Sequence, residues 1–217
     1  MKIFIFGASG QGKVVLDILR ENKNFEICGF VDNNKQLKGK VIDGIKVLGD
    51  SSTLDDLKQQ GIQGCIVAMG DTRDRYKVAN ELKQKGFYLI NAIHARASIA
   101  TNVLIGNNVT ISIGAVICAH SVIEDNVIIN SGAIVEHDNI IRNGAHVGPG
   151  ARLAGKVEVG EKTFVGIGAT VIQNIKIGKN SIIGAGAVVL GDIPDNVVAV
   201  GVPAKVIRSI IQDDLFG

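Results

Sequence analysis

A six-residue repeat constrains this chain more than any other feature, and it runs without a slip from Ile93 to Pro194. A branched aliphatic residue stands at every sixth position: Ile93, Ile99, Ile105, Ile111, Ile117, Ile123, Ile129, Val135, Ile141, Val147, Leu153, Val159, Val165, Val171, Ile177, Ile183 and Val189. Four residues after most of them comes a small or β-branched residue. A period of six fits neither an α-helix nor a flat alternating strand, and it is typical of a β-solenoid built from hexapeptide units. We predict such a solenoid, with three hexads to a coil and residues eighteen apart stacked.

Before residue 90 the pattern changes to short apolar strands that alternate with helical stretches. We expect strands at 2–6, 26–31, 64–69 and 87–93, helices at about 13–22, 52–60 and 72–85, and a hairpin over 41–48. This alternation predicts an open parallel α/β sheet of about half a doubly wound fold, which suits one mononucleotide. The chain is therefore expected to have two domains. Residues 1–92 form a half-Rossmann nucleotide-binding domain, and residues 93–217 form an all-β parallel β-helix with a C-terminal tail.

The loop from Gly7 to Gly12, after the first strand, is suited to a phosphate. Its glycines let the backbone approach a ligand closely, and the following helix N-terminus supplies free N–H groups. Asp32, at the end of the second strand, is where such folds place a carboxylate on ribose hydroxyls. As an alternative, the glycines serve only a tight turn and Lys13 is a solvated helix residue. A P-loop is disfavoured, because Val14 occupies the position of the Mg²⁺-binding Ser or Thr.

Composition excludes several classes of function. The net charge of +2, the absence of a basic block and the 4% of aromatic residues give no support for nucleic-acid binding. Cys28, Cys65 and Cys118 are far apart and lack CxxC spacing, so they are expected to be free thiols. The apolar start is too short for a signal sequence, and no run of eighteen apolar residues predicts a membrane span. We expect a soluble cytoplasmic protein.

Three of the four histidines lie within or beside the strongest part of the repeat, while His94 lies at the domain junction. His137 is notable because Glu136 and Asp138 flank it. Successive side chains of a strand point to opposite faces, so these carboxylates cannot both reach the imidazole unless the backbone bends. A carboxylate against the ring would fix its tautomer and raise its basicity, which makes a general base. A surface histidine among charges is the alternative.

The eighteen-residue stacking adds further candidates. Gly155 lies one coil above His137, where its N–H is suited to an oxyanion. Asn130 and Ser131 lie one hexad before the histidine and are suited to a polar substrate. His120, His137 and His146 do not share one hexad position, so we expect no zinc site of the solenoid carbonic anhydrase kind, and no metal.

The hexad array, the Gly7-to-Gly10 start GASG, the unit VEHD at 135–138 and the ending GVPAK at 201–205 together resemble the bacterial sugar acetyltransferases with a left-handed β-helix. More narrowly, the chain resembles the branch that contains the bacillosamine-type UDP-amino-sugar N-acetyltransferases and the sialic acid O-acetyltransferases. This resemblance spans essentially the whole chain. It implies a left-handed β-helix, a homotrimer, and acetyl-CoA as the co-substrate held between neighbouring helices.

The resemblance also implies roles for individual residues. His137 matches the general base and Asp138 its orienting acid, while Gly155 resembles an oxyanion donor. His146 resembles a residue near the acetyl-CoA thioester, and Asn130 resembles a sugar-contacting position. The positions that resemble the UDP-binding set are Gly10, Lys13, Asp32, Asn33 and Gly70.

Three positions depart from these patterns. Gln11 replaces a histidine found in some members, and Asn33 stands where an acid often follows Asp32. Both bear on which nucleotide is bound. Asn139 breaks the small-residue rule of its hexad, and the sequence suggests at most a hydrogen bond that steadies the corner.

The function predicted is direct transfer of acetyl from acetyl-CoA to the amine of a nucleotide-linked sugar, of the UDP-4-amino-4,6-dideoxy type. O-acetylation of sialic acid is the first alternative, and a non-catalytic trimeric scaffold is the second. The nucleotide-suited loop favours the nucleotide sugar, because free sialic acid carries no nucleotide.

Overall fold

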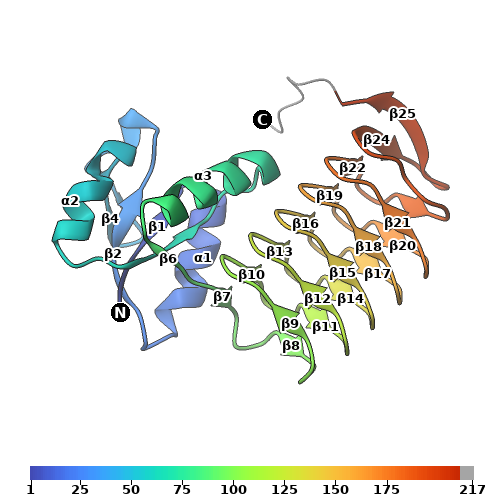
Figure 1. Ribbon diagram of the computed structural model, residues 1–217, viewed down its shortest axis with the longest axis horizontal. Helices are drawn as coiled ribbons and strands as arrows, with labels where there is room; N and C mark the ends of the chain where they lie inside the picture. Colours follow the sequence, from blue (N-terminus) through green and yellow to red (C-terminus); the bar gives the residue numbers. More distant parts are fainter. Residues whose placement is uncertain (211–217) are drawn as a thin grey trace.

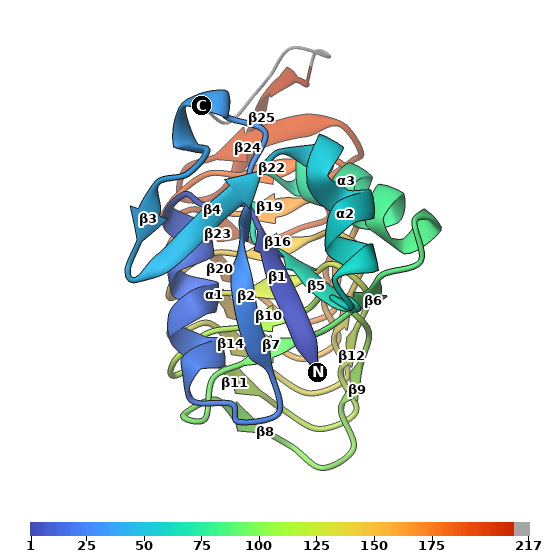
Figure 2. The same cartoon turned by 90° about the vertical axis from the view of Figure 1, so that its left-hand side faces the viewer.

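The computed structural model describes residues 1–210, which form an α/β part and a long solenoid (Figure 1). The α/β part packs against one face of the solenoid, with its sheet and helices in front of the stacked coils in the view of Figure 2. The tail predicted at the C-terminus lies, beyond Ile210, outside the described residues. No helix in the described part of the chain has the length and apolar character to cross a bilayer.

The α/β part is a six-stranded sheet in the order β3-β4-β2-β1-β5-β6. Its strands are β1 (Lys2–Phe6), β2 (Glu26–Val31), β3 (Val41–Ile42), β4 (Ile45–Gly49), β5 (Gly64–Val67) and β6 (Tyr88–Leu89). All neighbours are parallel except the hairpin β3–β4. The central strands are almost wholly apolar because both faces of the sheet are covered. The predicted parallel α/β sheet is confirmed.

Three helices cover the two faces of this sheet: α1 (Gly10–Arg20), α2 (Leu54–Gln59) and α3 (Thr72–Gln84), with 3₁₀ turns η1 (Lys35–Leu37) and η2 (Ser51–Thr53). Leu16 and Leu19 of α1 pack with Phe30 in one apolar cluster. Leu57 of α2 and Leu82 of α3 belong to the cluster on the other face. α1 begins three residues earlier than predicted, because the glycine loop itself enters the first turn.

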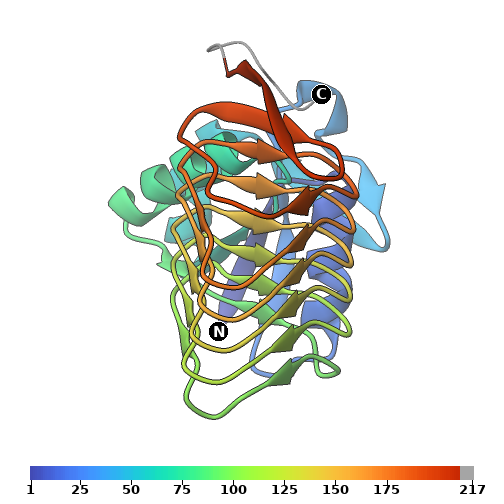
Figure 3. The ribbon, with the colours of Figure 1, turned by 90° about the vertical axis from the view of Figure 1, so that its right-hand side faces the viewer.

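The solenoid is a left-handed parallel β-helix in which each coil gives one short strand to each of three sheets (Figure 3). The first sheet, which faces the α/β part, contains β7 (Ala92–Ile93), β10 (Thr110–Ile111), β13 (Ile128–Ile129), β16 (His146–Val147), β19 (Phe164–Val165), β22 (Ile182–Ile183), β24 (Val197–Val200) and β25 (Lys205–Ser209). The second contains β8 (Ser98–Ile99), β11 (Val116–Ile117), β14 (Ile134–Val135), β17 (Arg152–Leu153), β20 (Thr170–Val171) and β23 (Val188–Val189). The third contains β9 (Leu104–Ile105), β12 (Val122–Ile123), β15 (Ile140–Ile141), β18 (Glu158–Val159) and β21 (Lys176–Ile177).

The register of these sheets confirms the repeat. Ile111 pairs with Ile129 and Ile129 with Val147, eighteen residues apart at each step. All three side chains are fully buried in the narrow core. The aliphatic position of each hexad therefore points inward, which is the packing that the six-residue period predicts.

Three corners join the sheets, and residues with positive φ bend the chain there. We call the turn from the first sheet to the second the first corner (130–133 in one coil). The second corner (136–139) leads to the third sheet, and the third corner (142–145) returns to the first. At the second corner, His120, Asp138 and Lys156 have φ of 59°, 60° and 58°. These residues lie in the left-handed region, which L-residues other than Gly, Asn and Asp rarely adopt.

Arg75 of α3 joins the two parts and is fully buried. Its Nε donates to Asn126 O and its Nη2 to Gly144 O, each at 2.8 Å, while Nη1 donates to Met69 O at 2.8 Å. Burial lowers the pKa of Arg75 to about 9, so the guanidinium stays charged at neutral pH. Because carbonyl groups of both parts satisfy this charge, α3 is fixed against the third corner of the solenoid.

Candidate active site

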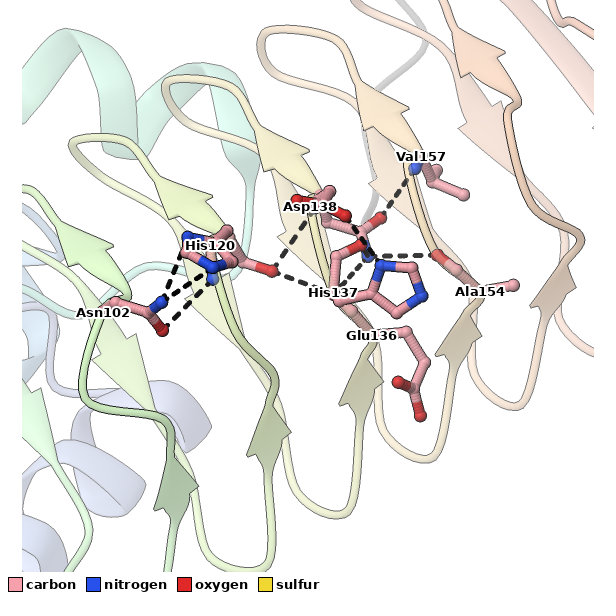
Figure 4. A network of polar contacts seen from close by, with 9 residues as sticks. Asn102, His120, Glu136, His137, Asp138, Ala154 and Val157 are labelled. Atoms are coloured by element: carbon pink, nitrogen blue, oxygen red, sulfur yellow. Dashed lines mark hydrogen bonds and ion pairs between the residues drawn. The ribbon is translucent and has the colours of Figure 1, made fainter.

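The turn that follows β14 brings His137 and Asp138 together (Figure 4). The positive φ of Asp138 turns its side chain to the same side as the imidazole. Nδ1 of His137 lies 2.8 Å from Oδ2 of Asp138. A carboxylate can only accept here, so the hydrogen of the neutral ring is on Nδ1 and Nε2 keeps its lone pair. The side chains are 57% and 42% exposed, so the pair is open to a substrate.

Asp138 remains ionised because of its surroundings. The hydrogen bond with His137 lowers the pKa of the Asp138 carboxyl, and Lys156 and His120 on the adjacent coils lower it further. Both neighbours lie eighteen residues from Asp138. The stacking of residues eighteen apart, which the repeat predicts, could therefore have identified Lys156 and His120 as neighbours of this carboxylate from the sequence. The turn that holds the histidine is thus built to keep a negative charge beside the ring.

Glu136 is not part of this pair. In Figure 4 its carboxylate is directed away from the imidazole of His137. Burial and then the nearby Glu136 side chain raise the pKa of the Cys118 thiol one coil below. The backbone bends at Asp138, and Asp138 rather than Glu136 is the carboxylate that pairs with the imidazole of His137.

Gly155 lies directly against the imidazole. A Cβ atom at this position would be 2.5 Å from Cε1 and 2.6 Å from Nε2 of His137, closer than side chains approach each other. The Gly155 N–H makes no hydrogen bond with any other described residue. The stacking that the period predicts is present, and the role of this N–H as an oxyanion donor remains a prediction.

Asn130 and His146 lie elsewhere in the chain, where the first sheet meets the α/β part. His146 of β16 is 7% exposed, and the Asn130 amide donates to its Nε2 at 3.1 Å. Phe164 packs edge-on to the ring at 4.9 Å between centroids. Burial and then the charge of Arg75 lower the pKa of His146 to about 3, so the ring is neutral. Its Nδ1 has no partner among the described residues. Within one chain, the strand β14 separates this pair from His137.

The predicted nucleotide-binding residues gather where β1, β2 and β5 end. These residues are Gly10, Lys13, Asp32, Asn33 and Gly70. The carboxylate of Asp32 accepts from Ala8 N and from Asn34 N, both at 2.8 Å, and so it shapes the glycine loop. Asn33 accepts from the N–H and hydroxyl of Ser51.

The loop itself leaves polar groups free for a ligand. The N-cap residue Ser9 forms no side-chain bond to the N–H groups of α1, and Gly10, Lys13 and Gly70 are exposed. Gly12 packs against the carbonyl of Gly7 and leaves no room for a side chain. Gln11 has a buried Nε2 without a partner in the described part of the chain. Across residues 1–210 no three His, Cys, Asp or Glu side chains come together as a metal site would require.

Comparisons with known proteins give matches to both parts of the chain. Residues 2–82 match the family model of the PglD N-terminal domain, and residues 156–191 match the bacterial transferase hexapeptide family. A variant of GDP-perosamine N-acetyltransferase from Caulobacter crescentus, solved with CoA and GDP-perosamine, is 40% identical. The match covers 96% of this chain and 98% of that chain, with a TM-score of 0.92.

Two further solved structures are similar over their full length. The acetyltransferase domain of PglB from Neisseria gonorrhoeae, in complex with acetyl coenzyme A, is 34% identical over 94% of this chain and 98% of that chain, with a TM-score of 0.89. WeeI from Acinetobacter baumannii is 25% identical over 95% of this chain and 100% of that chain, with a TM-score of 0.84.

Proposed function

Because this chain belongs to the hexapeptide-repeat sugar N-acetyltransferases with a PglD-type N-terminal domain, we propose that His137 is its general base for acetylation of a nucleotide-linked amino sugar. The enzyme uses acetyl-CoA. The observation that carries the proposal is the His137–Asp138 pair, which lies against Gly155 with Nε2 free. Residues 1–92 would hold the nucleotide, and the solenoid from residue 93 would carry out the transfer.

In the proposed reaction the sugar amine attacks the thioester carbonyl while Nε2 of His137 accepts a proton from the nitrogen. Asp138 stabilises the imidazolium, and the Gly155 N–H donates to the tetrahedral oxyanion. When the intermediate collapses, the C–S bond breaks and the CoA sulfur takes the proton from His137. No covalent enzyme intermediate is needed. His146 has too low a pKa to exchange protons near neutral pH, so its place in this scheme is as a neutral binding residue.

The acceptor we propose is a nucleotide-linked 4-amino-4,6-dideoxy sugar. The exposed glycine loop, the uncapped N-terminus of α1 and the cluster around Asp32 suit a nucleotide diphosphate. The sequence favours UDP, whereas the similar structure from Caulobacter crescentus was solved with GDP-perosamine. UDP-linked and GDP-linked sugars are therefore the two candidates for the assay.

We further propose a homotrimer with acetyl-CoA between neighbouring solenoids. Asn130 precedes β14 and His137 follows it, so the two residues lie at opposite edges of the second sheet. If this sheet faces a three-fold axis, the second corner of one subunit meets the first corner of the next. His137 would then work beside Asn130 and His146 of the neighbouring subunit.

The test of the function is steady-state turnover with acetyl-CoA and three acceptors: a UDP-linked amino sugar, GDP-perosamine and sialic acid. We expect His137→Ala to lower kcat by about 10²–10⁴-fold, the usual contribution of a general base, without loss of the fold. Asp138→Ala should cost less, because Asp138 orients the base. A His137→Ala enzyme that keeps more than about a third of wild-type activity would exclude this base. Turnover with sialic acid alone would favour the O-acetyltransferase, and turnover with none of the three would favour a scaffold.

A further inference from the structure

Asn139 occupies a core position at which a polar amide is out of place. The equivalent residues one and two coils away at the second corner are Val103, Ser121, Val157 and Ile175. The Asn139 side chain is fully buried. A buried amide lowers stability unless its hydrogen bonds are made, so its presence here calls for a specific role.

The amide of Asn139 links two turns of the solenoid. Its Oδ1 accepts from Val157 N at 3.0 Å, and its Nδ2 donates to Ala154 O at 3.0 Å (the dashed lines to both residues in Figure 4). The same Nδ2 donates to Glu136 O at 2.5 Å and lies 3.5 Å from His137 O. The partners therefore belong to the turn of the proposed base and to the turn that contains Gly155.

The bonds between coils alone do not require asparagine. At the third corner the hydroxyl of Thr163 donates to Gly178 O at 2.6 Å and accepts from Ser181 N at 3.0 Å. These partners lie fifteen and eighteen residues ahead, the same offsets as Ala154 and Val157 from Asn139. Asparagine adds to this arrangement the bond to Glu136 O, within the turn of His137.

The backbone on both sides of Gly155 is fixed by the same turn. Ala154 O accepts from Asn139, and Lys156 N donates to His137 O at 3.0 Å. Gly155 lies between these two bonds. A displacement of about 1 Å between reacting groups is enough to cost on the order of 10²-fold in rate. The distance between the imidazole and the Gly155 N–H is the quantity that these bonds hold constant.

We propose that Asn139 is a positioning residue for acetyl transfer, which fixes the turn of the base relative to the turn of the oxyanion donor. This inference rests on the proposed function, because it assumes that His137 is the base. Asn139 does not touch the reacting atoms, and its effect passes through the backbone of residues 136–137 and 154–157.

Asn139→Val is the decisive variant, because Val103 and Val157 show that the coil accommodates valine at this position. We expect kcat to fall by about 10- to 100-fold, while KM for acetyl-CoA and for the sugar changes by less than about twofold. Asn139→Thr, which has nearly the shape of valine, should restore the bonds to Ala154 and Val157 and recover part of kcat. Thr163→Val removes the same kind of link at the third corner and should leave kcat unchanged.

The outcomes separate this inference from the proposed function. Wild-type kcat in Asn139→Val, together with an inactive His137→Ala, would overturn the positioning role and leave the proposed function intact. Should Asn139→Val fail to fold, Asn139→Thr decides, because a kcat equal to that of the wild type would contradict the role of the bond to Glu136 O. An active His137→Ala would instead refute the proposed function itself.

Discussion

Asp138 reaches the imidazole of His137 only because its own backbone lies in the left-handed region, with φ at 60°. On an ordinary strand the two side chains would point to opposite faces. Gly155 makes the complementary contribution, since the ring occupies the volume that a Cβ atom would need. At the scale of single residues, the proposed site depends on one unusual dihedral angle and on one missing side chain.

We predict that Gly155→Ala lowers kcat by about 10- to 100-fold, because the new methyl group displaces the imidazole from the Gly155 N–H. Gly191→Ala is the matched control, since Gly191 lies at the same corner two coils above and has no atom within 4 Å of its Cβ position. Circular dichroism and turnover of both variants check this. Full activity of Gly155→Ala would show that the ring does not act at this place.

The contacts of single side chains were the features that the sequence predicted least well. The eighteen-residue period predicted that Gly155 lies over His137, because it depends only on counting. Which carboxylate pairs with the ring depended on the φ of residue 138, which no spacing encodes. The bonds of Asn139 to two turns likewise required coordinates, and the sequence suggested only that some bond steadies the corner.

At the scale of elements, the contact between α3 and the first sheet of the solenoid buries two ionisable groups side by side. Arg75 remains charged through its carbonyl partners, whereas His146 of β16 is held neutral. At neutral pH the buried ring is neutral, so the folded protein does not have to desolvate an imidazolium. At acidic pH, protonation of the buried ring is unfavourable.

This contact predicts a stability that depends on pH. The unfolded chain takes up a proton on His146 below about pH 6.5, whereas the folded protein does so only near pH 3, so stability falls as the pH decreases over this range. Between pH 7.5 and pH 5.0 the loss from this group amounts to about 2 kcal/mol. Urea unfolding of the wild type and of His146→Gln at both pH values measures it. Between pH 7.5 and pH 5.0, the free energy of unfolding should fall by about 2 kcal/mol more in the wild type than in His146→Gln. An equal fall in both proteins would contradict the low pKa of His146.

Most helices and strands could be predicted from the local sequence pattern, but the segment 87–93 could not. The single strand expected over 87–93 is divided into β6 and β7, which belong to different sheets. Asn91 lies between them and bonds to the first coil, donating to Gly106 O and accepting from Val109 N. Both halves of the segment are apolar, so hydropathy could not reveal that the chain changes sheet there.

At the scale of the whole molecule, the three faces of the solenoid differ. The α/β part covers the first sheet, and the third carries ion pairs of Arg142 with Glu124 and Glu158. The outward residues of the second sheet are Ser98, Val116, Ile134, Arg152, Thr170 and Val188, of which only Arg152 is charged, and the His137 corner lies at the edge of this sheet. The proposed trimer therefore places this face against the other copies of the chain.

We predict a trimer of the 22.9 kDa chain in sedimentation equilibrium at micromolar concentration. Ile134→Arg, on the outward face of the second sheet, should dissociate it and abolish turnover, because each site would lose its neighbouring subunit. Ile140→Arg makes the same change on the third sheet and should leave the mass unchanged. A wild type that sediments as a monomer, or dissociation by the second variant alone, would exclude this arrangement.

The last strands of the first sheet, β24 and β25, affect how one solenoid can contact another. A stack of identical parallel coils exposes unpaired N–H and C=O groups at its last strand, and such an edge is a template for polymerisation into fibres. Here β24 pairs with β22 at an offset of sixteen residues, and β25 then runs antiparallel along β24. The exposed β25 also brings the positive charges of Lys205 and Arg208 to this edge. Because β25 occupies the edge of the first sheet in the antiparallel direction, the parallel ladder of that sheet cannot continue into a second molecule.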